Sequence, residues 1–254
     1  MVKSPATATD SMTELATLDL RRLYLFLDFD GTLVDLAPTP DAIHVPDDLP
    51  TLLAGLHDRT QGRLAIVSGR EVAQIAHFLP TFPGAIYGAH GAESRVEGVD
   101  RPHPLAGSAT VAAVQAAAAD LVATDPALLL ERKKTGAVVH YRAAPTKGSA
   151  VRAALSDMIA GHPDLVLHAS KMAWEIRPAD ASKAGAVQAL MDGQPDDVRP
   201  VVIGDDTTDE EAMEVAQTMN GICIRVGEGD TIAPHRLDAP SDVHALLRRW
   251  AVQP

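Results

Sequence analysis

The sequence predicts an α/β protein with a doubly wound, Rossmann-like parallel-sheet core and an inserted α+β cap domain. Short apolar runs that end in polar residues alternate with segments of helical periodicity, as in a doubly wound sheet. After Pro104 this pattern changes to helices followed by pairs of strand-like runs, and from Ser182 the first pattern resumes. We therefore expect a core formed by residues 22–104 and 180–254, interrupted by a cap at residues 105–179.

The first half of the core is expected to contain three buried strands. The apolar runs 23–27, 64–67 and 85–87 have the length and composition of parallel strands that are covered on both faces. Apolar residues with helical spacing follow the second run, over residues 71–78. Residues 1–21 mix Ser, Thr, Ala and Asp without clear periodicity, and we expect them to form a flexible tail.

The inserted segment is expected to form a small antiparallel sheet backed by two helices. The Ala-rich stretch 108–123 has high helix propensity, and a second helix is predicted at 147–160. The predicted strands are 127–132, 136–142, 165–168 and 172–177. Trp174 is expected in the core of this domain because it alternates out of phase with Glu175.

The second half of the core returns to alternating strands and helices. The predicted elements are a helix at 182–191, a strand at 200–203, a helix at 209–217, a strand at 221–226 and a helix at 243–250.

Composition restricts the partners. The 254 residues include 22 Lys and Arg against 34 Asp and Glu, and the net charge of -12 argues against binding to nucleic acid or to an anionic membrane surface. The same charge would repel an anionic small molecule. A phosphate-binding site in this protein therefore needs a local source of positive charge, such as a divalent cation held by carboxylates.

Cysteine usage and the apolar segments indicate the compartment. Cys223 is the single cysteine, so neither a disulfide within the chain nor a cysteine-based zinc site can form. The first residues lack the apolar region of a secretory signal, and no stretch approaches the roughly 20 apolar residues that span a bilayer. A cytoplasmic location is the default expectation, and a monomer is the expected state.

The candidate site lies where the predicted strands end, because open α/β sheets bind ligands outside the carboxyl ends of their strands. The polar residues in these positions are Asp28, Asp30, Ser68, Arg70, His90, Asp205, Asp206 and Asp209. So many carboxylates at one edge of a sheet would repel each other unless a cation bound there. Oxygen ligands favour Mg²⁺ over Zn²⁺.

Asp28 and Asp30 stand two positions apart at the end of the first strand, so the alternation of a strand would turn both side chains to one side. One carboxylate could attack phosphorus and form an acyl phosphate, while the other transfers protons. The same residues could instead cap a turn in which Gly31 supplies an unusual backbone angle. This motif alone does not decide between the two interpretations.

Four segments together resemble the signature motifs of the haloacid-dehalogenase-like superfamily. They are Asp28-Phe29-Asp30-Gly31-Thr32-Leu33, Ser68-Gly69-Arg70, Lys183 and Gly204-Asp205-Asp206-Thr207-Thr208-Asp209, in this order. The resemblance implies that Asp28 is the nucleophile and Asp30 the acid/base. It implies that Ser68 and Lys183 hold the transferring phosphoryl group.

The resemblance also implies a Mg²⁺ site. Its expected ligands are Asp28, Asp205 and the backbone carbonyl of Asp30, and either Asp209 or Asp206 would complete or orient the shell. Taken singly, Lys183 could be a solvated surface lysine, and Asp209 could favour a helix N-terminus. Superfamily members that act as pumps tend to carry Thr in place of Asp30, so the aspartate indicates a phosphatase that releases its intermediate to water.

Further segments resemble the trehalose-6-phosphate phosphatases, over most of the chain from Leu23 to Leu247. They are Glu131-Arg132-Lys133, His140-Tyr141-Arg142, Glu175-Ile176-Arg177-Pro178 and His90-Gly91-Ala92-Glu93. The resemblance implies trehalose 6-phosphate as the substrate. It assigns contacts with glucose hydroxyls to Glu131, Lys133 and Glu175, with Arg142 and Arg70 as helpers, and gives His90 and Gly91 the shaping of the loop that faces the cap.

Two features keep alternatives open. For the charged cap residues, the pattern alone fits the solvated face of a half-buried sheet equally well. The motif lysine is usually followed directly by Gly, whereas Lys183-Ala184-Gly185 shifts the glycine by one.

The alternative functions are another capped sugar phosphatase, of the sucrose-phosphate or mannosyl-phosphoglycerate type, and a non-catalytic sugar-phosphate sensor. A nucleotide-binding module is discounted because both glycine-rich phosphate motifs are missing.

Overall fold

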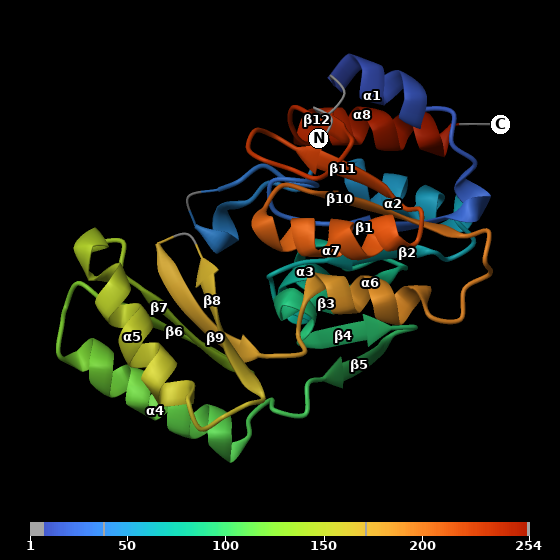
Figure 1. Ribbon diagram of the computed structural model, residues 1–254. Helices are drawn as coiled ribbons and strands as arrows, with labels where there is room; N and C mark the ends of the chain where they lie inside the picture. The colour runs from blue at the N-terminus through green and yellow to red at the C-terminus, as the bar shows by residue number, and fades with distance from the viewer. Residues whose placement is uncertain (1–7, 38, 171, 253–254) are drawn as a thin grey trace. The chain divides into compact units, whose positions relative to one another are not determined.

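The structure is a computed structural model that describes residues 8–37, 39–170 and 172–252 of the chain (Figure 1). The chain divides into two compact units. The core unit comprises Met1–Arg101 and Ser182–Pro254, and the inserted unit comprises Pro102–Ala181. Each unit has its own sheet and its own apolar core. Among the described residues, no helix combines the length and the apolar character needed to cross a bilayer.

The core unit is built on an eight-stranded sheet with the order β12-β11-β10-β1-β2-β3-β4-β5. The strands are β1 Leu23–Leu27, β2 Leu64–Val67, β3 Ala85–Gly88, β4 Glu93–Val96, β5 Val99–Pro102, β10 Arg199–Gly204, β11 Ile222–Val226 and β12 His235–Leu237. The pairs from β12 through β3 are parallel, and β4 runs antiparallel to β3. The predicted doubly wound α/β fold is confirmed.

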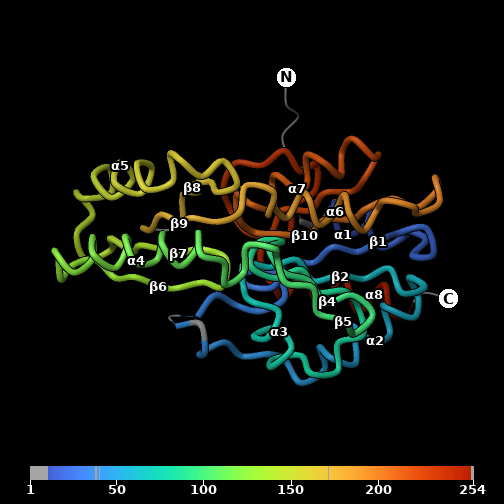
Figure 2. Tube along the Cα trace, turned by 90° about the horizontal axis from the view of Figure 1, so that it is seen from below, coloured from blue at the N-terminus to red at the C-terminus, as the bar shows by residue number. Residues whose placement is uncertain are grey.

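Helices cover both faces of this sheet. They are α1 Ala8–Leu15, α2 Leu49–Arg59, α3 Val72–Phe78, α6 Lys183–Met191, α7 Thr207–Thr218 and α8 Pro240–Ala251, with short 3₁₀ turns η1 Leu20–Arg22, η2 Pro40–Ala42 and η3 Ala89–Gly91. Leu25 and Leu27 of β1 pack in one core cluster, with α2, α3 and α8, whereas Tyr24 and Phe26 pack in the other, with α6 and α7. Figure 2 shows α6 and α7 on one side of the central strands and α2 and α3 on the other.

The expectation of a flexible tail at residues 1–21 is wrong for the described part of that segment; residues 1–7 lie outside the described residues. Leu15 at the end of α1 is 1% exposed, and its carbonyl accepts a hydrogen bond from Trp250 Nε1 at 2.8 Å. Ser11 Oγ accepts a hydrogen bond from the backbone N–H of Arg236 at 3.2 Å. Contacts with α8 and β12 therefore hold a helix that is too short to be stable by its own propensity.

The inserted unit has a four-stranded antiparallel sheet with the order β6-β7-β9-β8. Its elements are α4 Ala109–Ala123, β6 Leu129–Lys133, β7 Gly136–His140, η4 Pro145–Lys147, α5 Gly148–Ile159, β8 Leu165–Ser170 and β9 Ala173–Pro178. Figure 1 shows α4 and α5 on one face of this sheet. Trp174 packs in the core between the sheet and these helices, as predicted, and its Nε1 donates to the carbonyl of Gly148 at 2.9 Å.

Candidate active site

The parallel strands of the core unit end at one edge of the sheet, and the site is assembled there. Asp28 follows β1, Ser68 follows β2 and Asp205 follows β10. Asp28 stays in register with the neighbouring strand, because its backbone N–H donates to the carbonyl of Ile203 at 2.9 Å. Lys183 is the first residue of α6, whose N-cap Ser182 accepts a hydrogen bond from a backbone N–H of the first turn. This is the strand edge where open α/β sheets bind ligands.

Lys183 joins two carboxylates in the interior of the core unit. Its Nζ donates to Asp28 Oδ1 at 2.7 Å and to Asp209 Oδ1 at 2.7 Å. The three side chains are 2%, 5% and 3% exposed, so Lys183 is not a solvated surface lysine. Burial acts to lower the pKa of Lys183, but Asp209 and Asp28 outweigh it and raise the pKa above its ordinary value. The side chain is therefore a fixed ammonium.

The carboxylates of this cluster compete for that one cation. Burial, with a smaller contribution from Asp205 and against the attraction of Lys183, raises the pKa of Asp28 to about 7. Burial and the charges of Asp209 and Asp206 raise the pKa of Asp205 to about 6. Burial also raises the pKa of Asp209 well above its ordinary value. The cluster holds more negative charge than Lys183 neutralises, and a bound cation would relieve the excess.

Asp206 and Asp209 have different roles at the start of α7. Asp206 is the N-cap, and its Oδ1 accepts hydrogen bonds from Thr208 N at 2.7 Å, Thr208 Oγ1 at 2.6 Å and Asp209 N at 3.2 Å. Burial acts to raise its pKa, but Lys183 and Thr208 outweigh burial and lower it. Asp209 Oδ2 accepts from the backbone N–H groups of Asp205 at 3.2 Å and Asp206 at 3.1 Å. Asp209 thus fixes the loop that carries Asp205 while it also contacts Lys183.

Three carboxylates fit a hard divalent cation. Asp28, Asp205 and Asp209 each offer one oxygen, and these oxygens lie within 4.8 Å of one another. An all-carboxylate donor set is the kind that Mg²⁺ prefers. Of the two residues that the sequence left open, Asp209 belongs to this group. The carboxylate of Asp30 does not, because it faces an arginine.

Glycines permit the close approach of these side chains. Gly31 has a φ of +77°, and a Cβ built there would lie 2.1 Å from Asp205 Oδ2. A Cβ at Gly204 would lie 2.1 Å from Asp209 Cγ. Any larger residue at either position would displace a carboxylate of the cluster.

Arg70, expected to help to bind the sugar, lies against Asp30. Its Nε donates to Asp30 Oδ2 at 2.6 Å and its Nη2 to Asp30 Oδ1 at 2.7 Å. Ser68 is 1% exposed, and its Oγ accepts a hydrogen bond from the backbone N–H of Arg70 at 3.1 Å. The short segment after β2 therefore brings an arginine to the acid/base candidate.

His90 and Gly91 lie in η3, beside the start of α6. The backbone N–H of His90, at a φ of 57°, donates to the carbonyl of Ser68 at 2.9 Å. A Cβ at Gly91 would lie 2.6 Å from the carbonyl oxygen of Ser182. Both residues therefore shape the loop next to Ser68 and Lys183, and their expected role toward the cap stays a prediction.

The inserted unit carries charged groups on the face of its sheet that α4 and α5 leave open. Glu131 lies opposite Val138 of β7, which in turn lies opposite Glu175 of β9, so the two glutamates share this face. Glu131 contacts Lys133 Nζ at 2.7 Å and His140 Nε2 at 3.0 Å. Burial raises the pKa of Glu175.

Arg142 is not in this strand pattern. The prediction extended the strand as far as 142, whereas β7 ends at His140. Arg142 is exposed and lies in the segment between β7 and η4, where the backbone N–H of Tyr141 bonds to the carbonyl of Met172. The alternation of side chains along a strand therefore does not extend to Arg142.

Sequence reasoning missed Arg225, which supports the loop of the acidic cluster from β11. Its side chain is buried, and its Nη1 donates to the carbonyl of Asp206 at 2.9 Å and to Glu210 Oε1 at 3.3 Å. A charged residue within the apolar run 222–226 was the available signal.

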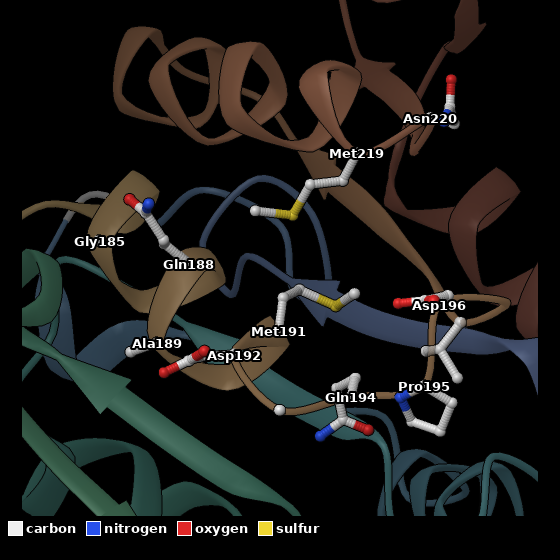
Figure 3. A pocket seen from close by; sticks show the side chains of 12 residues that line it. Gly185, Gln188, Ala189, Met191, Asp192, Gln194, Pro195, Asp196, Met219 and Asn220 are labelled. Carbon is white, nitrogen blue, oxygen red and sulfur yellow. The ribbon is translucent and has the colours of Figure 1, made fainter.

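An open pocket of about 810 Å³ lies elsewhere in the core unit, at the C-terminal part of α6 and the loop that follows (Figure 3). Met191 and Met219 extend into it, and Asp192 and Asp196 are among the residues that line it. None of the cluster carboxylates lines this pocket. A small cavity of about 10 Å³ is lined by Asp28, Lys183 and Asp209 and belongs to the site.

The fold and the buried lysine–carboxylate cluster define a phosphatase of the haloacid-dehalogenase-like class. Residues 26–241 match the trehalose-phosphatase family. The chain is 37% identical over 225 residues to a probable trehalose-phosphate phosphatase of Sinorhizobium fredii, covering 87% of this chain and 84% of that protein. It is 32% identical over 245 residues to trehalose-6-phosphate phosphatase of Escherichia coli, covering 94% and 90%. The chain belongs to the trehalose-phosphatase family and is a phosphoric monoester hydrolase.

Solved structures show the same fold. The C-terminal domain of Candida albicans trehalose-6-phosphate phosphatase superimposes with a TM-score of 0.80 at 23% identity, covering 98% of each chain. A trehalose-6-phosphate phosphatase related protein gives a TM-score of 0.72 at 24% identity, over 90% of this chain and 96% of that one.

Proposed function

We propose that this protein hydrolyses trehalose 6-phosphate to trehalose and phosphate, with Asp28 as the nucleophile. Its membership of the trehalose-phosphatase family supports the substrate. The single observation that carries the chemistry is the buried ion pair between Lys183 and Asp28 at the carboxyl edge of the sheet. An ammonium in this position can neutralise a phosphoryl group held beside Asp28.

The proposed reaction has two steps. An Asp28 oxygen attacks phosphorus, the bond between phosphorus and the sugar oxygen breaks, and Asp30 gives its proton to that oxygen, which releases trehalose. In the second step Asp30 takes a proton from water, the resulting hydroxide oxygen attacks phosphorus, and the aspartyl phosphate breaks down to phosphate and the Asp28 carboxylate. Ser68 and Lys183 hold the phosphoryl oxygens in both steps.

We propose Mg²⁺ as the cofactor. The side chains of Asp28, Asp205 and Asp209 and the backbone carbonyl of Asp30 would hold it. When bound, it neutralises charge on the phosphoryl oxygens. The excess of carboxylates over cations in the cluster supports this assignment.

We propose that the inserted unit selects the substrate. Glu131, Lys133 and Glu175 share the open face of its sheet and would hydrogen-bond glucose hydroxyls. Arg142 is assigned an auxiliary contact, and His90 and Gly91 the shaping of the loop beside Lys183. It also stays a prediction that the protein is monomeric and cytoplasmic and that it binds neither nucleic acid nor membranes.

Phosphate release from a panel of esters tests the proposal. We expect the purified chain to prefer trehalose 6-phosphate over sucrose 6-phosphate and glucose 6-phosphate, and to lose all turnover when a chelator is added. Preference for a different ester would keep the core chemistry and overturn the role of the inserted unit. Binding of trehalose 6-phosphate without release of phosphate would make the chain a sensor instead.

A further inference from the structure

The side chains of Arg70 and Asp30 form a two-point contact between segments that are 40 positions apart. One planar guanidinium binds both oxygens of Asp30, at 2.6 and 2.7 Å. Such a fork fixes both the direction and the plane of a carboxylate, which a single contact cannot do. We propose that Arg70 is a positioning residue that aims the Asp30 carboxyl at the ester oxygen of the substrate. This inference rests on the acid/base role of Asp30 in the proposed function.

The guanidinium is itself held in place by two aromatic rings. The Cζ atom of Arg70 lies 5.7 Å from the ring centroid of Phe29 and 5.4 Å from that of Phe78. These distances are within the range of a cation–π contact. The Arg70 side chain is 10% exposed, so it has little room to adopt other rotamers.

The backbone of Arg70 is fixed as well. Its N–H donates to Ser68 Oγ at 3.1 Å, and its carbonyl accepts from the N–H of Ala89 at 2.7 Å. A Cβ at Gly88 would lie 2.7 Å from the same carbonyl oxygen, so the two segments approach as closely as a glycine allows. Arg70 is therefore held by its backbone hydrogen bonds, by the two aromatic rings against its guanidinium and by the two hydrogen bonds to Asp30.

Asp30 remains accessible despite this contact. Its side chain is 31% exposed, against 10% for Arg70, so one side of the carboxyl is covered by arginine and the other can be reached from outside. In the first step Asp30 gives its proton to the sugar oxygen as the P–O bond breaks. In the second step it takes a proton from water. Both transfers need the carboxyl in one orientation, and loss of alignment in such a step can lower the rate about 100-fold.

The alternative role for Arg70 is direct contact with the sugar. The two roles differ in kinetics. A residue that binds the sugar lowers KM, whereas a residue that acts through Asp30 affects kcat and must reproduce the pattern of an Asp30 substitution. The decisive variants are Arg70→Met, Arg70→Lys and Asp30→Asn, assayed with trehalose 6-phosphate and with p-nitrophenyl phosphate, whose leaving group departs without a proton.

For Arg70→Met we expect kcat on trehalose 6-phosphate to fall about 10- to 100-fold with KM changed less than about twofold. Asp30→Asn should lose more. In both Arg70→Met and Asp30→Asn, kcat should fall more on trehalose 6-phosphate than on p-nitrophenyl phosphate. Arg70→Lys keeps the charge but not the fork and should restore kcat only in part.

Arg21→Met is a matched control, because the Nε and Nη2 atoms of Arg21 also bind the two oxygens of an aspartate, Asp19, on the surface of the core unit. It should keep wild-type kinetics. If circular dichroism shows that Arg70→Met is unfolded, Phe78→Leu replaces it as the test variant. This substitution removes one of the two rings that contact the guanidinium. It should lower kcat by a smaller factor, with the same order of losses on the two substrates.

A raised KM at unchanged kcat in the Arg70 variants would overturn the inference. It would also be overturned if the Arg70 variants lost more kcat on one substrate and Asp30→Asn lost more on the other. Failure of the proposed function is separate: wild-type protein would then not hydrolyse trehalose 6-phosphate, or Asp30→Asn would retain full activity.

Discussion

The Nζ atom of Lys183 lies 2.7 Å from Asp28 Oδ1, although the two residues are 155 positions apart in the chain. The side chains are 2% and 5% exposed, so the first residue of α6 and the residue that follows β1 meet in the interior. The pair therefore contributes both to the folded core and to the proposed chemistry.

Replacement of Lys183 by Met should affect both properties. We expect kcat to fall at least about 100-fold, because one fixed charge that stabilises the phosphoryl group is lost. The free energy of unfolding should fall by about 3–5 kcal/mol, since a partner of buried carboxylates is removed. Turnover assays and urea titration measure the two effects. The surface variant Lys147→Met, whose side chain is 49% exposed, should change neither; wild-type turnover in Lys183→Met would contradict the assignment.

Asp28→Asn should abolish turnover and leave the fold intact. An amide cannot form the aspartyl phosphate, and the variant removes one of several mutually repelling charges in the cluster. We expect kcat to fall at least about 10⁴-fold with an unchanged circular dichroism spectrum. Asp58→Asn, at a side chain that is 88% exposed, serves as the control. Near-wild-type activity in Asp28→Asn would refute the covalent mechanism.

Removal of divalent cations should stop turnover and lower thermal stability. A cation that binds only the folded protein raises Tm by mass action, and here it also relieves the repulsion among Asp28, Asp205 and Asp209. Differential scanning fluorimetry should show a Tm several degrees higher with Mg²⁺ than with chelator. The Asp205→Asn variant should lose most of that difference. An equal Tm with and without Mg²⁺ in the wild type would argue against the site.

Glu131→Ala should discriminate between substrates. We expect KM for trehalose 6-phosphate to rise about 10-fold, because hydrogen bonds to charged groups contribute about 1.5–3 kcal/mol, while KM for p-nitrophenyl phosphate should not change. The matched control is Arg132→Ala, the next residue of β6, whose side chain points to the opposite face of the sheet. Equal changes for both substrates would remove Glu131 from sugar recognition.

The thiol of Cys223 should be unreactive in the folded protein. Burial raises its pKa from 9.0 to about 12, and Cys223 is 0% exposed. Because the pKa is raised, the thiol stays protonated: at pH 8 about 10⁻⁴ of it is thiolate, against about a tenth for an ordinary thiol. Ellman's reagent should label the unfolded chain in urea within minutes and the native protein far more slowly. Complete labelling of native protein at pH 8 in minutes would contradict this burial.

The core strands could be predicted from the sequence because each is buried on both faces and reads as a continuous apolar run. The run 23–27 coincides with β1, and the run 64–67 with β2. The motif residues that follow these runs were found for the same reason. The elements that were missed are α1, α2, β4, β5 and β12. The buried leucines of α2 do follow helical spacing, so that helix could have been found from the sequence. The other four are short elements at the periphery of the sheet, and tertiary contacts stabilise them.

The class of the protein could be recognised from the sequence, since each apolar run and the polar residues that follow it form a local pattern of the chain. The tertiary structure was needed to show which side chains meet. It placed Asp209 on Lys183 rather than only at a helix terminus, and it placed Arg70 on Asp30. The physical reason is that these pairings depend on burial and on the close approach of segments far apart in the chain, which no local periodicity encodes.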